Sequence, residues 1–144
     1  MTVAIASDHA GYDLKEAIKN HFELGGVNYI DFGTDSTESV DYPVFANKVC
    51  ASLKAGESNL GVLVCGTGIG MSIAANKHRN IRAARCTDTY SAKMARLHND
   101  ANIITLGSRV TGPGLAIEVV NKFLATDFEG GRHTGRVNMY DDPM

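Results

Sequence analysis

The sequence has no tryptophan, few prolines and only three cysteines among its 144 residues. The cysteines are odd in number and widely spaced, which argues against a disulfide framework or a cysteine-based zinc site and favours a reducing cytoplasm. No apolar run reaches the length of about 18 residues that spans a bilayer. The N-terminal segment MTVAIASDHAG also lacks the basic residues that begin a signal peptide. These absences predict a cytoplasmic protein without a membrane partner.

A strong excess of charge of one sign is also lacking. The chain has 14 Lys and Arg against 16 Asp and Glu, for a net charge of −2. Proteins that bind nucleic acid usually carry a basic surface, so we expect no nucleic-acid partner. The 44% apolar and 21% charged residues are typical of a globular protein. A chain of this length is sufficient for one domain with a hydrophobic core, and we expect a single domain over residues 1–144.

Short apolar runs alternate with helical patterns along the chain. The apolar runs predict strands with apolar residues on both faces. Such strands are typical of a parallel sheet that helices cover on both sides. Between them, apolar residues recur at helical spacing, as Leu14, Ile18 and Phe22 do. The pattern predicts an α/β fold, a Rossmann-like three-layer α/β/α sandwich with a five-stranded parallel sheet. The predicted strands are Val3–Ser7, Val27–Phe32, Leu60–Cys65, Ile81–Cys86 and Asn102–Gly107.

The polar segment 127–144 follows the last long helical pattern. Gly130 and Gly131 separate most of it from that helix. It carries Arg132 and Arg136 on either side of His133. Two arginines at this spacing suit a phosphate group, although a solvated basic tail is the more common explanation of such a pattern. We expect this segment to form a C-terminal arm.

Three glycines at alternate positions follow the third predicted strand. The segment Gly66–Gly70 matches neither the dinucleotide-binding fingerprint nor a Walker A loop. Glycines allow a tight turn and let a ligand approach the backbone N–H groups. Such groups at the start of a helix favour a phosphate or a developing oxyanion. A tight turn that binds no ligand explains the same spacing.

Cys65 lies directly before this loop. A cysteine at the end of a buried strand is usually a small hydrophobic residue. A thiol that faces a helix N-terminus can instead act as a base or nucleophile. Cys50 lies within a helical pattern and Cys86 has no glycine loop beside it, so both are expected to be structural.

Other polar residues follow the predicted strands, where ligands bind in such folds. Asp8 and His9 follow the first strand, either as a helix cap and a surface histidine or as a pair for binding or proton transfer. His98 lies near the end of a predicted helix, where a histidine is favourable without any function. No two histidines have metal-ligand spacing with a carboxylate, so no metal ion is predicted.

Five motifs extend in order from the first strand to about residue 137: SDHAGYDLK, DYPVFANKV, CGTGIGMSIAANK, YSAKMARLHNDANIITLGSR and EGGRHTGRV. Taken together, they resemble the ribose-5-phosphate isomerase B family, which belongs with the ribose/galactose isomerases. The resemblance implies a Rossmann-like sandwich that interconverts aldose and ketose phosphates through an enediolate, with no metal or organic cofactor. It also implies a homodimer, or a tetramer built from dimers, with active sites shared between subunits.

The resemblance implies roles for the residues around the glycine loop. Cys65 matches the base that moves the proton between C1 and C2, and Thr67 matches a hydroxyl that assists there. One branch of the family has a glutamate base after the third glycine. This chain has Met71 at that position and therefore follows the cysteine branch. The loop that contains Gly66, Gly68 and Gly70 matches the family's loop whose N–H groups hold the enediolate oxygen.

The resemblance also implies the residues that bind the sugar phosphate. His98 matches the residue that opens the furanose ring, Asp8 lies near the ring oxygen and hydroxyls, and Asn99 matches a hydroxyl contact. The family's phosphate clamp corresponds to His9, Arg132 and Arg136 in this chain. Arg109 matches a further basic contact, and Tyr42 matches a residue at the edge of the pocket.

The resemblance therefore implies an isomerase that interconverts ribose 5-phosphate and ribulose 5-phosphate in the pentose phosphate pathway. The GGRH segment favours this type over the galactose-6-phosphate subunits. Allose 6-phosphate and galactose 6-phosphate are alternative substrates, because the sequence does not give the depth of the pocket. A non-catalytic phosphate- or nucleotide-binding module on the same fold is the second hypothesis. A redox-sensing thiol is the third, weakened because no resolving cysteine lies near Cys65.

Overall fold

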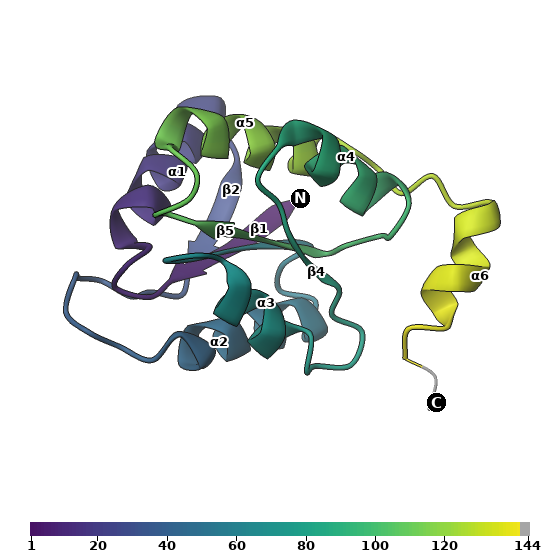
Figure 1. Ribbon diagram of the computed structural model, residues 1–144, viewed down its shortest axis with the longest axis horizontal. Coiled ribbons are helices and arrows are strands. Elements are labelled where there is room, and N and C mark those ends of the chain that lie inside the picture. Colours follow the sequence, from purple (N-terminus) through teal and green to yellow (C-terminus); the bar gives the residue numbers. More distant parts are fainter. Residues whose placement is uncertain (142–144) are drawn as a thin grey trace.

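One parallel sheet of five strands organises the chain, as a computed structural model describing residues 1–141 shows (Figure 1). The strand order is β2-β1-β3-β5-β4, and every paired register is parallel. This confirms the predicted five-stranded α/β fold. The strands are β1 (Thr2–Ser7), β2 (Asn28–Asp31), β3 (Leu60–Cys65), β4 (Ala83–Arg85) and β5 (Ile103–Gly107). The helices are α1 (Tyr12–Gly25), α2 (Tyr42–Lys54), α3 (Ile69–Ala75), α4 (Thr89–Leu97), α5 (Pro113–Leu124) and α6 (Arg132–Asn138).

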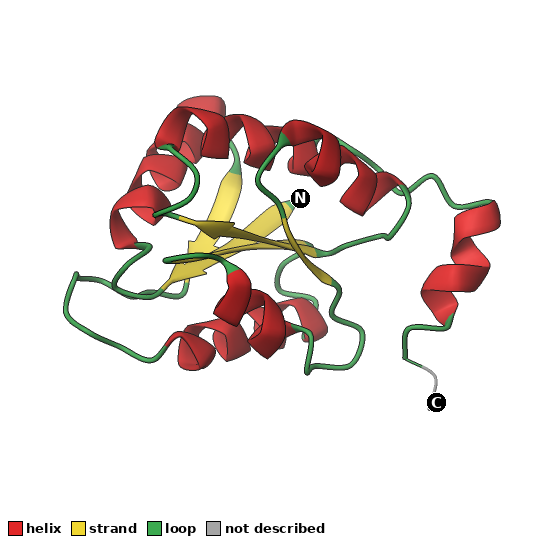
Figure 2. Cartoon of the chain, in the orientation of Figure 1, coloured by secondary structure: helices red, strands yellow, loops and turns green. Residues whose placement is uncertain are grey.

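Helices cover both faces of the sheet. Helices α1, α4 and α5 pack on one face, and α2 and α3 pack on the other (Figure 2). Neighbouring residues of a strand alternate between the two cores: Val62 and Val64 face the first, whereas Leu63 faces the second. All three side chains are fully buried. This explains why the central strands are continuous apolar runs, since each of their faces meets a helix layer.

The two edge strands are shorter than the sequence indicates. The strand predicted over 27–32 forms over Asn28–Asp31, and the one predicted over 81–86 forms over Ala83–Arg85. Strands β2 and β4 each pair with a single neighbour. Their residues are only partly buried or exposed. At the edge of the sheet, the apolar run therefore predicts a longer strand than forms, because an edge strand has hydrogen bonds to only one neighbouring strand.

A charged group lies fully buried between α1 and the end of β2. The Lys15 ammonium donates to both carboxylate oxygens of Asp31, at 2.8 and 2.9 Å, and to the Thr34 carbonyl at 2.8 Å. Lys19 lies 2.8 Å from the same carboxylate. Burial by itself raises the pKa of Asp31, but the hydrogen bonds from Lys15 and Lys19 outweigh it and hold that pKa below its usual value. The carboxylate therefore stays charged and joins α1 to the loop after β2.

The strand order reverses between β1 and β3, because the chain leaves β1 for β2 on one side and later returns to place β3 on the other. In open α/β sheets, ligands bind at the carboxyl ends of the strands beside such a reversal. Asp8 directly follows β1, and Cys65 ends β3. The fold therefore places two of the predicted site residues at the position where ligands bind most often.

The predicted C-terminal arm contains a short helix that the sequence did not indicate. Gly130 and Gly131 have φ angles of 70° and 56°, which favour glycine, and α6 begins directly after them. Figure 1 shows α6 in yellow, set apart from the two helix layers beyond the end of α4. Residues 142–144 of the predicted arm lie outside the described residues. Within residues 1–141, the helices are too short or too polar to cross a membrane.

Candidate active site

Cys65 ends β3 and receives a hydrogen bond from the loop that follows it. The Gly68 N–H donates to Cys65 Sγ at 3.1 Å, and the cysteine is only 5% exposed. Gly68 has a φ of 79°, a conformation that favours glycine. Its carbonyl accepts a hydrogen bond of 2.9 Å from Thr105 Oγ1 on β5, so the neighbouring strand holds the loop in place. An N–H donor directed at sulfur binds a thiolate more strongly than a thiol.

The other two cysteines lie in different surroundings. Burial raises the pKa of Cys50 and of Cys86 to about 11. Both thiols therefore stay protonated near neutral pH, and the Cys50 thiol donates a long hydrogen bond of 3.9 Å to the Ala75 carbonyl. All three cysteines are unpaired. The structural role predicted for Cys50 and Cys86 agrees with this burial.

The glycines of the loop make room for other parts of the protein. A Cβ atom on Gly70 would lie 2.7 Å from carbon atoms of the Tyr42 ring, and one on Gly66 would lie 3.2 Å from a guanidinium nitrogen of Arg109. The sequence suggested that these glycines let a ligand approach. The structure shows that two of them also let Tyr42 and Arg109 lie against the loop. Both residues therefore border the segment that follows Cys65.

Asp8 and His9 are held by two different loops. Asp8 is 6% exposed, and its Oδ1 accepts the Gly11 N–H at 3.0 Å, which stabilises the start of α1. His9 Nδ1 accepts the Val40 N–H at 3.2 Å. Because Nδ1 is the acceptor, a neutral His9 carries its proton on Nε2. Nε2–H is therefore the group with which His9 can donate to a ligand.

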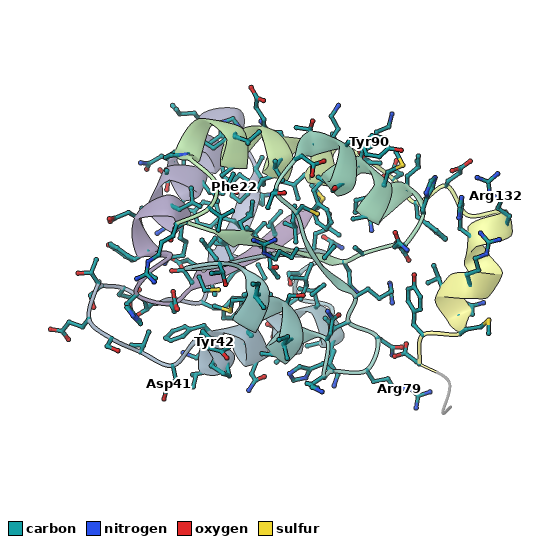
Figure 3. The ribbon with its side chains drawn as sticks, in the orientation of Figure 1. Phe22, Asp41, Tyr42, Arg79, Tyr90 and Arg132 are labelled. Atoms are coloured by element: carbon teal, nitrogen blue, oxygen red, sulfur yellow. The ribbon has the colours of Figure 1, made fainter. Side chains whose placement is uncertain are left out.

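The other predicted site residues lie at the opposite end of the molecule. Helix α4 returns from the end of β4 to the start of β5, so His98, which follows its last residue, lies near the amino ends of the strands. Asn99 follows directly, and Arg132 and Arg136 belong to α6. In Figure 3, Tyr42 and Arg132 lie far apart along the long axis of the molecule. The described chain therefore divides the predicted residues into two groups.

His98 belongs to a cluster that the sequence analysis missed. Its ring stacks on the His133 ring with centroids 4.2 Å apart and planes at 17°. Glu129 Oε2 lies 3.9 Å from His98 Nε2 and 3.6 Å from His133 Nε2. The prediction that no histidine pair has a carboxylate at metal-ligand spacing is therefore wrong. The spacing of Glu129 and His133, four residues apart, was readable, but His98 is distant in sequence.

The surroundings of His133 disfavour its charged form. Burial lowers the pKa of His133, and the nearby positive charges of His98 and Arg132 lower it further, against the opposing effect of Glu129. The imidazole is therefore neutral at neutral pH, with a nitrogen lone pair free to accept a proton or a ligand.

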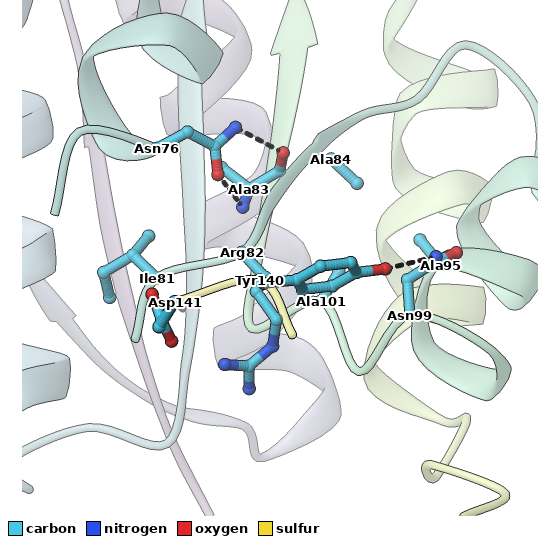
Figure 4. Close-up of a pocket in the computed structure, with 10 residues that line it drawn as sticks. All are labelled: Asn76, Ile81, Arg82, Ala83, Ala84, Ala95, Asn99, Ala101, Tyr140 and Asp141. Atoms are coloured by element: carbon cyan, nitrogen blue, oxygen red, sulfur yellow. Dashed lines mark hydrogen bonds between the residues drawn. The ribbon is translucent and has the colours of Figure 1, made fainter. Parts of the chain in front are cut away.

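A cavity of about 360 Å³ lies on the same side of the molecule as His98, and the neighbouring residue Asn99 lines it (Figure 4). Asn99 donates a hydrogen bond of 2.9 Å to the hydroxyl of Tyr140, which closes one wall. Arg82 and the alanines of β4 form other parts of the lining. Cys65 and its glycine loop are not among the lining residues, so this cavity is separate from the predicted catalytic crevice.

The parallel α/β sheet belongs to the Rossmann-like class of folds, in which small molecules bind beside the strand reversal where the hydrogen-bonded cysteine and the glycine loop lie. The family model described as Ribose/Galactose Isomerase matches residues 3–140. The chain belongs to this family and is a sugar-phosphate isomerase.

Two relatives and one solved structure illustrate the similarity. Ribose-5-phosphate isomerase B of Escherichia coli (strain K12) is 47% identical over 135 residues, which cover 94% of this chain and 91% of that protein. A D-erythrulose-4-phosphate isomerase of Pectobacterium atrosepticum is 44% identical and covers 95% of this chain and 91% of its own. The crystal structure of a ribose 5-phosphate isomerase from Thermotoga maritima has a TM-score of 0.96 at 51% identity, with 97% of both chains covered.

Proposed function

We propose that the protein interconverts ribose 5-phosphate and ribulose 5-phosphate through an enediolate, with Cys65 as the base. The observation that carries this proposal is the N–H of Gly68 directed at Cys65 Sγ beside the strand reversal. The similarity to a ribose-5-phosphate isomerase B supports the substrate. This chemistry needs a base, a hydrogen-bond donor for the developing oxyanion and a group that opens the sugar ring. It requires no metal or organic cofactor.

The reaction balances with the groups of this chain. The Cys65 thiolate removes the proton on C2 of the open-chain aldose, and negative charge develops on O1. A backbone N–H of the Gly66–Gly70 loop, assisted by the Thr67 hydroxyl, would stabilise that oxygen, and one such donor contributes about 3 kcal/mol. The Cys65 thiol then returns the proton to C1, while the proton of the O2 hydroxyl passes to O1. The product is the ketose, and Cys65 is again a thiolate.

We infer that two copies of the chain build each site. The base and loop lie at the carboxyl edge of the sheet, whereas the proposed ring-opening residue His98 lies near its amino edge. A homodimer, or a tetramer built from dimers, brings the two groups together. The second copy then supplies His98, the hydroxyl contact Asn99 and two phosphate ligands, Arg132 and Arg136.

The first copy supplies the rest of the sugar-phosphate contacts. Asp8 is buried beside the reversal point, in a position to meet the ring oxygen and hydroxyls. The His9 Nε2–H completes the phosphate clamp, and Arg109 adds positive charge beside the loop. Tyr42 borders the loop at Gly70 and forms the edge of the pocket.

Shared sites predict complementation between two inactive variants. Cys65→Ala and His98→Asn each lack one half of the site, so a mixed dimer retains one intact site and one with both defects. Coexpressing the two variants in equal amounts should restore roughly a quarter of the wild-type activity, because half of the dimers are mixed. The measurement is ribose 5-phosphate turnover by the purified mixture. The control is the double variant coexpressed with an inactive Cys65→Ala chain. Activity no higher than that of the separate variants would contradict shared sites.

Turnover of several sugar phosphates, measured with a chelator present, tests the substrate. We expect the highest kcat/KM with ribose 5-phosphate and lower values with allose 6-phosphate, galactose 6-phosphate and erythrulose 4-phosphate. The last is included because of the Pectobacterium relative. A higher kcat/KM with a hexose phosphate would replace the pentose by that substrate. Binding of all four without turnover of any would favour the non-catalytic module.

The proposed reaction is a step of the pentose phosphate pathway. A cytoplasmic location fits this role, and the three unpaired cysteines support a reducing compartment. The redox-sensing alternative is weaker, because Cys50 and Cys86 are buried thiols that stay protonated near neutral pH.

A further inference from the structure

Three side chains that can bind a metal ion converge where the C-terminal arm meets α4. One ring nitrogen of His98, one ring nitrogen of His133 and one carboxylate oxygen of Glu129 all lie within 4.8 Å of one another. The backbone supports this arrangement, because the Glu129 N–H donates to the Leu97 carbonyl at 3.1 Å, directly beside His98. The cluster therefore joins the end of α4 to the start of α6.

A second observation indicates a missing partner. The side chain of His133 is 7% exposed, and its Nε2 atom is buried without a hydrogen-bond partner. Buried polar atoms almost always have a partner, so an unpaired one requires an explanation. This nitrogen points toward Glu129 Oε2 at 3.6 Å, which is longer than a hydrogen bond. The space between the two atoms suits a third group that binds both.

We propose that His98, Glu129 and His133 form a binding site for a divalent transition-metal ion, with Zn²⁺ as the best fit. Two imidazoles and one carboxylate are a known zinc donor set that leaves a fourth position open. Zinc binds these ligands at about 2.0–2.2 Å, which places them about 3.4 Å apart in a tetrahedral site. The Glu129–His133 distance is already close to that value. His98 would have to rotate its ring out of the stack with His133 to approach the ion, and its side chain is 36% exposed.

The charges around the cluster identify its most important ligand. Arg132 and Arg136 both act on His133 as nearby positive charges, and they oppose the binding of a dication. Glu129 is the negative group of the cluster. Removing its charge should therefore weaken metal binding at least as much as removing either histidine.

Metal binding at this site would inhibit the isomerase. This consequence rests on the proposed function, in which His98 opens the sugar ring and needs a ring nitrogen that can exchange a proton. An imidazole nitrogen that holds a metal ion has no lone pair left for that proton. The site would thus act as a reversible inhibitory site that senses a transition metal of the zinc type.

The test measures binding directly, in a background without the reactive thiol. Zn²⁺ is titrated by calorimetry into the Cys65→Ala protein, and we expect one ion per chain. Adding Glu129→Gln or His133→Asn should weaken binding at least about tenfold. The matched control is His21→Asn, because His21 is a surface histidine whose Nε2 bonds Asn121 at 2.9 Å. That control should bind as the Cys65→Ala protein does. If His133→Asn does not fold, Glu129→Gln decides, since the Glu129 side chain is 51% exposed.

Two further readouts separate this site from the proposed function. Co²⁺ in the Cys65→Ala protein should give the absorption of a tetrahedral nitrogen and oxygen site, and Glu129→Gln should abolish it. Zn²⁺ should also inhibit the wild-type isomerase reversibly, at concentrations at least about tenfold lower than for Glu129→Gln. Two outcomes would overturn the site: no binding of Zn²⁺ by the Cys65→Ala protein, or binding that stays as tight as in that protein after Glu129→Gln or His133→Asn is added. A protein that binds Zn²⁺ as expected but turns over no sugar phosphate keeps the site and rejects the proposed function.

Discussion

Replacing Cys65 with alanine is expected to lower kcat for ribose 5-phosphate about a thousandfold, since a positioned base typically contributes a factor of about 10² to 10⁴. The change removes the sulfur that accepts the Gly68 N–H, and little else, because alanine keeps the backbone and most of the buried volume. The measurement is steady-state turnover, with circular dichroism to check that the fold is intact. We expect KM to change less than kcat, since the proposed phosphate and hydroxyl ligands remain.

Cys50→Ala is the matched control for this substitution. Cys50 is also a buried cysteine, but its burial keeps the thiol protonated near neutral pH. The control should lose some stability, as any large-to-small core change does, and retain kcat. A Cys65→Ala protein with kcat within tenfold of the wild type would place the base on another residue.

The second large effect concerns stability. Lys15→Met should lower the free energy of unfolding by about 3 kcal/mol, because it removes one partner of a buried ion pair. Methionine preserves the length of the side chain, so the loss comes from the ammonium and its bonds to Asp31 and the Thr34 carbonyl. The measurement is urea unfolding near neutral pH, where a lower midpoint with an unchanged slope reports a change in stability.

Lys19→Met is the control for the buried pair. Lys19 contacts the same carboxylate, but its side chain is 17% exposed and also pairs with Glu16, so its loss should cost no more than about 1 kcal/mol. Equal losses for the two variants would show that burial of Lys15 is not what makes its contacts important.

Acid gives a further signature of the same pair. The pKa of Asp31 is lower in the folded protein than its ordinary value, so the stability from its ionised form is fully present above that ordinary pKa. It is lost as the pH falls through the folded-state pKa. The difference between wild type and Lys15→Met should therefore shrink in strong acid, and a constant difference would argue against the ion pair as its cause.

Several features were readable from the sequence because they depend on local periodicity. The central strands are continuous apolar runs, since helices cover both of their faces. The glycine loop after Cys65 could be recognised from the spacing of its glycines. Gly68 has a positive φ angle, which glycine adopts easily. The edge strands were less accurately predicted, because their length depends on hydrogen bonds to a single neighbour that no local pattern reports.

The partners of individual side chains were not readable in the same way. Lys15 follows Leu14 in a helical pattern, and nothing in that pattern indicates that it is fully buried against Asp31 at the end of β2. His98 and His133 are distant in sequence, yet their rings stack. Such contacts depend on how separate elements pack against one another, and local sequence patterns do not report that packing.

The sequence by itself determined the class of fold, the family to which the chain belongs and the candidate residues, because alternating periodicity and ordered motifs are properties of the linear chain. Only the tertiary structure decided that these candidates form two groups. Helix α4 runs back from the end of β4 to the start of β5, which carries His98 away from the edge where Cys65 lies. The direction of a helix relative to a sheet is a property of packing, and no motif records it.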